Sequence, residues 1–173
     1  MRIVAGKFAG RDLVSPSDFR VRPTAEHVRA GLLDLLAADL PDASCCDLFA
    51  GTGALGLEAI SRGARRCDFV ETRPSSLAAL KSNVVKFRLK ERTRIFKKDA
   101  LPFAGQLNEG AYDLVFCDPP YESRMLDRVI ESWQARRFSK VLAVEHARVH
   151  KLPKGAFTKA FEDSAIKIGR AHV

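Results

Sequence analysis

Four consecutive residues after an apolar run have the residue types and spacing that best suit a catalytic role: Asp118, Pro119, Pro120 and Tyr121. Two consecutive prolines cannot continue a central strand, so the chain must leave the sheet there in a stiff, extended turn. That turn fixes the Asp118 carboxylate, the Pro119 carbonyl and the Tyr121 ring relative to one another. The two oxygens could accept hydrogen bonds from an exocyclic amine while the ring stacks on its base, and such orientation supplies much of the rate of a group transfer. The alternative is a Pro-Pro turn with a packing tyrosine.

A glycine-rich segment supplies a second candidate group. Residues 47–56 contain a G-x-G-x-x-G pattern at Gly51, Gly53 and Gly56. Such glycines permit a tight turn, a close approach of the backbone to a ligand, and close packing of a helix on a strand. Two cofactors fit this pattern, a nicotinamide dinucleotide and S-adenosylmethionine.

Four acids distinguish the two cofactors. Asp47, Glu71, Asp99 and Asp118 each close a predicted strand, so their carboxylates are expected to face one crevice. A pyrophosphate would be repelled by Asp47 beside the glycine turn, whereas the ammonium and sulfonium of S-adenosylmethionine suit an acidic crevice. We expect Asp47 near the methionine end, Glu71 at the ribose and Asp99 near the adenine amino group. For each acid alone, the alternative is an N-cap or a turn residue.

Short apolar runs that alternate with amphipathic segments must position these groups. Buried strands alternating with helices predict the α/β class, a mostly parallel sheet with helices on both faces and ligands at the carboxyl ends of the strands. Residues 1–15 are expected to form a small β-hairpin, after which Pro23 and Thr24 open a helix. The other expected strands are residues 44–50, 67–71, 93–99, 112–117, 140–145 and an antiparallel pair, 157–162 with 165–173; the other expected helices are residues 53–62, 75–89 and 126–138.

The composition of the 173-residue chain restricts its class. An apolar share of 46% and a charged share of 29% are typical of a globular protein and exclude general disorder. No run reaches the roughly 18 uncharged apolar residues of a membrane span, and the N-terminus lacks the apolar centre of a secretory signal, so we expect a cytoplasmic protein without a membrane partner. The four cysteines form no C-x-x-C pair and no histidine lies at zinc spacing, so core thiols and no metal site are expected.

Taken together, the motifs resemble a known family. Residues 118–121 and the Asp-Leu-Phe-Ala-Gly-Thr-Gly of residues 47–53 are similar to amino-methyltransferases that modify exocyclic nitrogens of nucleobases. Other stretches resemble the bacterial RsmD-type enzymes, which methylate a guanine N2 in 16S ribosomal RNA. The resemblance covers nearly the whole chain in the family's order; these stretches are residues 1–11, 22–24, 28–29, 55–59 and 61–64.

The resemblance implies a Rossmann-like, S-adenosylmethionine-dependent methyltransferase. It implies a single domain over residues 1–173, with a hairpin and helix extension over residues 1–40 and the Rossmann-like core over residues 44–173. It also implies a monomer that acts on ribosomal RNA or the small ribosomal subunit. Catalysis is implied for Asp118, Pro119, Pro120 and Tyr121, and cofactor contact for Asp47, Phe49, Gly51, Gly53, Glu71, Asp99, Ala100, Asp118, Arg22 and Thr24.

The net charge of +8 is unevenly distributed. Residues 73–98 hold nine basic residues and one acid, and a basic surface favours a polyanion, although a solvated surface is the alternative. We expect RNA contact at this segment and at Arg2, Lys7 and Arg11, on the basic face of the expected hairpin.

Three other functions remain open. An adenine-N6 DNA methyltransferase uses the same four-residue motif, although a carboxylate, which only accepts, matches the adjacent N1–H and N2–H donors of guanine. A nicotinamide-dependent oxidoreductase would account for the glycines and leave residues 118–121 without a role. A non-catalytic RNA-binding module with the same fold would bind RNA without a cofactor.

Overall fold

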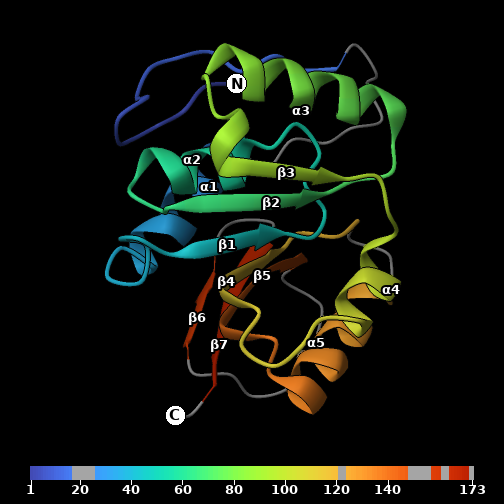
Figure 1. Cartoon of the computed structure of the whole chain (residues 1–173). Coiled ribbons are helices and arrows are strands. Elements are labelled where there is room, and N and C mark those ends of the chain that lie inside the picture. The colour runs from blue at the N-terminus through green and yellow to red at the C-terminus, as the bar shows by residue number, and fades with distance from the viewer. Residues whose placement is uncertain (17–25, 121–123, 148–156, 161–163, 172–173) are drawn as a thin grey trace.

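A mixed seven-stranded sheet organises the chain in the computed structural model, which describes residues 1–16, 26–120, 124–147, 157–160 and 164–171. The strand order is β3-β2-β1-β4-β5-β7-β6 (Figure 1). The first five strands in this order are parallel to one another. The strand β7 pairs antiparallel with both β5 and β6, and the sequence predicts the antiparallel pair of β6 and β7. The strands are β1 Ser44–Asp47, β2 Arg66–Val70, β3 Thr93–Phe96, β4 Tyr112–Cys117, β5 Ser139–Ala147, β6 Phe157–Ala160 and β7 Ser164–Arg170.

Helices cover both faces of the sheet, which confirms the predicted α/β class. Successive strand residues point to opposite faces, so Cys45 belongs to one buried cluster and Cys46 to the other. The first cluster includes Leu32, Leu57 and Leu80 of three helices, and the second includes residues of the helix pair that lies side by side in Figure 1, α4 and α5. The helices are α1 Glu26–Leu35, α2 Ala54–Ser61, α3 Pro74–Lys86, the short 3-10 helix η1 Lys90–Arg92, α4 Ala100–Gly105 and α5 Met125–Arg136.

The two arms of the N-terminal segment pair in the antiparallel sense of the expected hairpin: the backbone N–H groups of Ile3 and Leu13 donate to the carbonyls of Arg11 and Met1, at 3.0 and 2.9 Å. The pairing amounts to one isolated bridge, between Arg2 and Asp12, and not to two full strands. The physical reason is that the turn between them packs against the end of α2 and bonds there. The backbone N–H groups of Lys7 and Phe8 donate to the carbonyl and hydroxyl oxygens of Ser61, at 2.8 and 2.9 Å. A Cβ on Gly6 would lie 2.1 Å from the Ser61 carbonyl oxygen, so the approach requires glycine.

Two smaller differences lie close to the candidate site. The third strand ends at Phe96 rather than at residue 99, and the next helix, α4, was not predicted. Its six residues are too few to show helical periodicity in the sequence. The predicted helix start at Pro23 and Thr24 lies outside the described residues.

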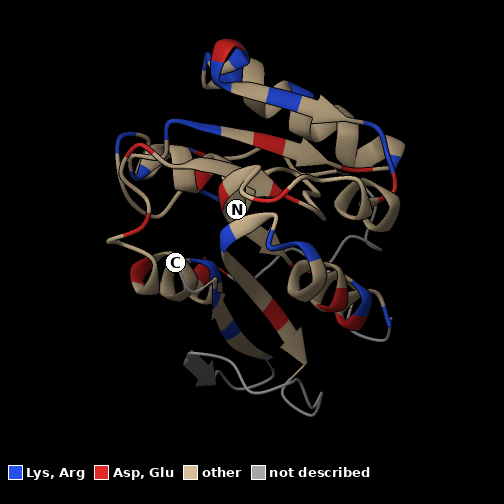
Figure 2. Cartoon of the chain, turned by 60° about the horizontal axis from the view of Figure 1, so that its bottom comes forward, with Lys and Arg blue, Asp and Glu red and all other residues tan. Residues whose placement is uncertain are grey.

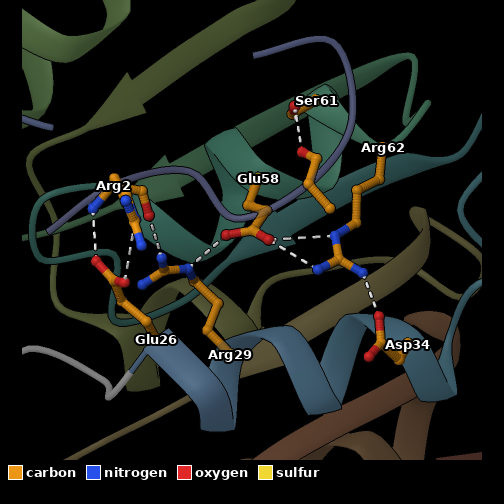
Figure 3. A network of polar contacts seen from close by, with 8 residues as sticks. Arg2, Glu26, Arg29, Asp34, Glu58, Ser61 and Arg62 are labelled. Carbon is orange, nitrogen blue, oxygen red and sulfur yellow. Dashed lines mark hydrogen bonds and ion pairs between the residues drawn. The ribbon is translucent and has the colours of Figure 1, made fainter. Parts of the chain in front are cut away.

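A buried network of charged side chains joins the N-terminal segment and α1 to α2 (Figure 3). The Arg29 and Glu58 side chains are fully buried, and Arg29 Nε donates to Glu58 Oε2 at 2.7 Å. A second nitrogen of Arg29 donates to the backbone carbonyl of Arg2. The other oxygen of Glu58 accepts from Arg62 at 2.8 Å, and Arg62 in turn donates to Asp34 at 2.6 Å. The network fixes α2, the helix that follows the glycine turn.

The described part of the chain offers no metal site. It contains no group of three or more His, Cys, Asp or Glu that could hold a metal ion. The four cysteines, Cys45, Cys46, Cys67 and Cys117, are buried free thiols, which confirms the prediction of core thiols. Burial raises the pKa of Cys45 to about 12, so this thiol stays protonated at neutral pH. Separately, no helix within the described ranges combines the length and apolar character of a membrane span.

We expect Glu58→Leu to lower the free energy of unfolding by about 3–5 kcal/mol, because it leaves Arg29 buried without its counter-charge. Chemical denaturation followed by circular dichroism would measure the change. Asp34→Asn is the matched control, since Asp34 is 67% exposed and its loss should cost at most about 1 kcal/mol. Equal effects of the two substitutions would contradict this account of the network.

Candidate functional site

Three predicted acids come together at the carboxyl ends of neighbouring strands. Asp47 ends β1, Glu71 follows β2 and Asp118 follows β4. Because β1 lies between β2 and β4 in a parallel arrangement, these ends meet at one edge of the sheet. The charges of Asp118 and Glu71 both act on the Asp47 carboxyl group and raise its pKa. The structure therefore brings these three predicted acids to one edge of the sheet, while their shared role in binding stays a prediction.

Asp47 is the least satisfied of these acids. Its side chain is 1% exposed, and neither carboxylate oxygen has a hydrogen-bond partner within the described ranges. Burial, followed by repulsion from Asp118, raises the pKa of Asp47 to about 7. The backbone N–H groups of Gly56 and Phe49 point toward it and act in the opposite direction, without completing a hydrogen bond. A buried carboxyl group in this state favours a cation beside it.

The glycine turn leaves room for a ligand next to this acid. Gly51 and Gly53 have φ angles of 54° and 81°, in the left-handed region that favours glycine. A Cβ on Gly51 would meet no atom within 4 Å, so this face of the turn is open. A Cβ on Gly56 would lie 2.5 Å from a ring carbon of Phe69, so the third glycine serves the packing of α2 on β2. A Cβ on Gly53 would lie 2.4 Å from the Leu80 side chain, so the tight turn and the helix packing match the prediction, while the approach of a ligand to the backbone stays a prediction.

Glu71 holds the glycine turn from the neighbouring strand. One of its oxygens, Oε2, accepts from the Gly51 backbone N–H at 2.8 Å. The other accepts from the N–H groups of Thr72 and Arg73, both at 2.7 Å. Each carboxylate oxygen has further lone pairs, so Glu71 can still accept hydrogen bonds from a ligand hydroxyl. Its contact with a ribose stays a prediction.

Asp99 has a structural role that the sequence analysis weighed as an alternative. It is the N-cap of α4, and its Oδ1 accepts from the Leu101 backbone N–H at 3.0 Å. Its contact with an adenine, and that of the buried Ala100, stay predictions. Phe96 and Phe103 flank this turn with ring centroids 5.0 Å apart, and sequence reasoning did not single them out. The sequence signal that could have identified them is an aromatic residue at the end of a strand, Phe96, followed seven residues later by a second aromatic residue, Phe103.

The catalytic motif is described only in part. The fourth strand ends at Cys117, so the predicted departure of the chain from the sheet at Asp118 is confirmed. Asp118 is half-buried, Pro119 buried and Pro120 exposed. Tyr121 lies outside the described residues, as do Arg22 and Thr24. Phe49, a further predicted cofactor contact, follows β1 and is half-buried beside the second cluster.

The three N-terminal cations are engaged within the chain. Arg2 Nε lies 3.7 Å from Glu26 Oε2, and Lys7 Nζ lies 5.9 Å from the Phe8 ring centroid. The Arg11 guanidinium lies 4.4 Å from the Phe87 ring centroid, and its Nη2 donates to the Lys86 carbonyl at 2.9 Å. These contacts hold the N-terminal segment against α1 and α3. Binding of RNA by Arg2, Lys7 and Arg11 stays a prediction.

Comparisons with known proteins place this geometry in a family. The family model described as Conserved hypothetical protein 95 matches residues 1–165. The Escherichia coli ribosomal RNA small subunit methyltransferase D is 35% identical over 130 residues, 75% of this chain and 65% of that enzyme, so the match spans less than two thirds of its length. The enzyme of the same name from Haemophilus influenzae is 33% identical over 132 residues, 75% of this chain and 68% of the enzyme. The solved structure of Escherichia coli yhhF superposes with a TM-score of 0.84 at 29% identity, covering 97% of this chain and 96% of that one.

We expect Asp47→Asn to raise the free energy of unfolding at pH 8 and to change it little at pH 4. The unfolded chain releases the Asp47 proton near its ordinary pKa of 3.8 and the folded protein near 7, so this residue makes the protein less stable as pH rises between those values. About three pKa units correspond to at most about 4 kcal/mol. Thermal unfolding of both proteins between pH 4 and pH 8 would measure the difference.

Asp113→Asn provides a control of opposite sign. Burial alone would raise the pKa of Asp113, but hydrogen bonds from Lys140 and Ser44 hold it at about 2. Its carboxylate therefore contributes stability above about pH 4 that is lost as pH falls toward 2, and removing it should lower stability at pH 8. A loss of stability in Asp47→Asn at pH 8 would contradict the account given for Asp47.

Proposed function

The chain belongs to the Conserved hypothetical protein 95 family, and we propose that it transfers a methyl group from S-adenosylmethionine to the exocyclic N2 of a guanine in 16S ribosomal RNA. The methyltransferase activity and the methyl donor are those of its family. The observation that carries the proposal is a buried Asp47 that lacks a hydrogen-bond partner among the described residues and lies beside Asp118, at an open glycine turn. A cationic donor and an amine acceptor would meet at this point.

The donor end of the site fits S-adenosylmethionine. Asp47 offers two unused acceptor oxygens to a positive charge, Gly51 leaves space against the backbone, and Glu71 offers lone pairs to the ribose hydroxyls. When bound, this donor supplies an electrophilic methyl group on a sulfonium. Asp47 would lie near its methionine end and Asp99 near its adenine. A dinucleotide would instead bring a doubly anionic pyrophosphate toward Asp47 and Glu71, which disfavours the oxidoreductase alternative.

The acceptor end rests on the turn after β4. An exocyclic amine is a poor nucleophile because its lone pair is delocalised into the ring. The Asp118 carboxylate and the Pro119 carbonyl would accept its two N–H groups, and Tyr121 would stack on the base. Holding both N–H bonds favours a pyramidal nitrogen with its lone pair directed at the methyl group, so these residues act by orientation.

We also propose that residues 1–173 act as one domain, as a monomer, on ribosomal RNA or the small ribosomal subunit in the cytoplasm. The extension over residues 1–40 and the core over residues 44–173 share one hydrophobic cluster, which supports a single domain. Ile3, Leu13 and Leu33 of the extension pack there with Leu57 and Phe69 of the core.

The product of the reaction tests this function. The protein would be incubated with labelled S-adenosylmethionine and, separately, with ribosomal RNA, small ribosomal subunits or duplex DNA. Digestion to nucleosides should then yield labelled N2-methylguanosine from one of the RNA substrates. Label in N6-methyladenine of DNA, or no label in any substrate, would overturn the proposal.

We expect Asp118→Ala to lower the turnover of methyl transfer by about a hundredfold or more, because the amine loses one of its two acceptors. Binding of S-adenosylhomocysteine, measured by isothermal titration calorimetry, should persist. Glu109→Ala removes an exposed acid from the loop before β4 and should leave both measurements unchanged. Turnover near the wild-type value in Asp118→Ala would remove Asp118 from the catalytic group.

A further inference from the structure

Four cations lie at the same edge of the sheet as the acidic site, and we call them the rim cations: Arg73, Lys97, Lys98 and Arg124. Arg73 follows β2, and its backbone N–H bonds to Glu71. Lys97 and Lys98 follow β3 and lead directly into Asp99. Arg124 precedes α5, after the turn that begins at Asp118. The rim cations therefore surround the ends of the strands that carry the donor and acceptor residues.

The total charge distribution does not distinguish this edge. Figure 2 shows Lys and Arg spread over several helices, strands and loops, often beside Asp or Glu. Position and partners must therefore decide which cations are available to a ligand.

Several basic side chains away from the rim are used to hold the fold. Arg94 forms a hydrogen-bonded ion pair with the buried Asp68 at 2.8 Å, and Lys140 pairs with Asp113 at 2.7 Å. Two nitrogens of Arg170 donate to the two oxygens of Asp39, both at 2.7 Å. The N-terminal cations Arg2, Lys7 and Arg11 are engaged as described above.

The rim cations differ from these in both exposure and partners. All four are exposed, and across the described ranges none has an ion pair or a side-chain hydrogen bond to the protein. Arg73 and Arg124 are also the N-cap residues of α3 and α5, of 13 and 12 residues. A cation at a helix N-terminus is unfavourable by about 0.3–1 kcal/mol, so the stability of the helices does not account for arginine at either position.

We propose that the rim cations bind the phosphates on either side of the target nucleotide in RNA, a proposal that rests on the proposed function. The three carboxylates of Asp47, Glu71 and Asp118 would by themselves repel a polyanion from the site, and the four rim charges offset them. A base that must be turned out of a helix also requires its flanking backbone to be held. Phosphate contacts hold and orient the RNA without reading its sequence.

Neutralisation of one cation from each of three strand ends tests the proposal. The rim variant combines Arg73→Gln, Lys97→Gln and Arg124→Gln. The control variant combines Arg65→Gln, Arg136→Gln and Arg137→Gln, which removes the same charge from exposed residues before β2 and β5, at the opposite edge of the sheet. Affinity would be measured between about 50 and 200 mM salt, with the RNA or subunit that the wild-type protein methylates.

The rim variant is expected to bind RNA more weakly, with the slope of log K against log salt reduced by about 2 to 3. The control variant should keep the wild-type slope. Binding of S-adenosylhomocysteine and the thermal midpoint should not fall in the rim variant, because its cations hold no part of the fold; a fall in either would overturn the proposal.

The outcomes separate this proposal from the function on which it rests. If the wild-type protein methylates RNA and the two variants bind it with equal slopes, the rim assignment is wrong and the proposed function stands. If the control variant loses the slope instead, the rim assignment is wrong and the RNA surface lies at the opposite edge of the sheet. If the wild-type protein labels no RNA, the proposed function falls and the rim assignment with it.

Discussion

Repulsion among carboxylates at the ends of β1, β2 and β4 is the constraint on which the site depends. A parallel sheet brings these ends together, and the glycine turn then buries Asp47 without a hydrogen bond to either of its oxygens from the part of the chain that the structure describes. The folded chain holds this unfavourable arrangement because the surrounding core is large and well packed. Under the proposed function, the same arrangement would attract a sulfonium donor and disfavour a pyrophosphate, so the cost to stability and the choice of cofactor would have one origin.

The described residues of the N-terminal extension support the site through α2. Arg29 and Glu58 form a fully buried ion pair between α1 and α2, and Ser61 at the end of α2 binds the N-terminal turn. Such a pair contributes little net stability but is costly to break, so it specifies one position for the helix. The extension thereby fixes the element whose first residues complete the glycine turn.

Much of the fold and part of the site could be predicted from the sequence. Periodicity and apolar runs gave the parallel strands and the three long helices, because these signals are local. The antiparallel pairing of the N-terminal arms was predicted, but the bond of their turn to Ser61 was not, since it is a contact far along the chain that no local pattern encodes. The internal contacts of Arg11 were equally invisible, since they depend on which neighbour the fold brings close, whereas the capping role of Asp99 is local and was among the alternatives. Residue type predicted which side chains could take part in chemistry. Contacts formed in the folded protein determined which of those side chains are engaged by other residues.

The turn that would receive the donor is tied down on both sides. Glu71 bonds to the Gly51 backbone N–H, and α2 is fixed by the network around Glu58. A ligand would therefore bind to a turn that already has a fixed conformation. Binding would then require no loss of conformational freedom in this turn.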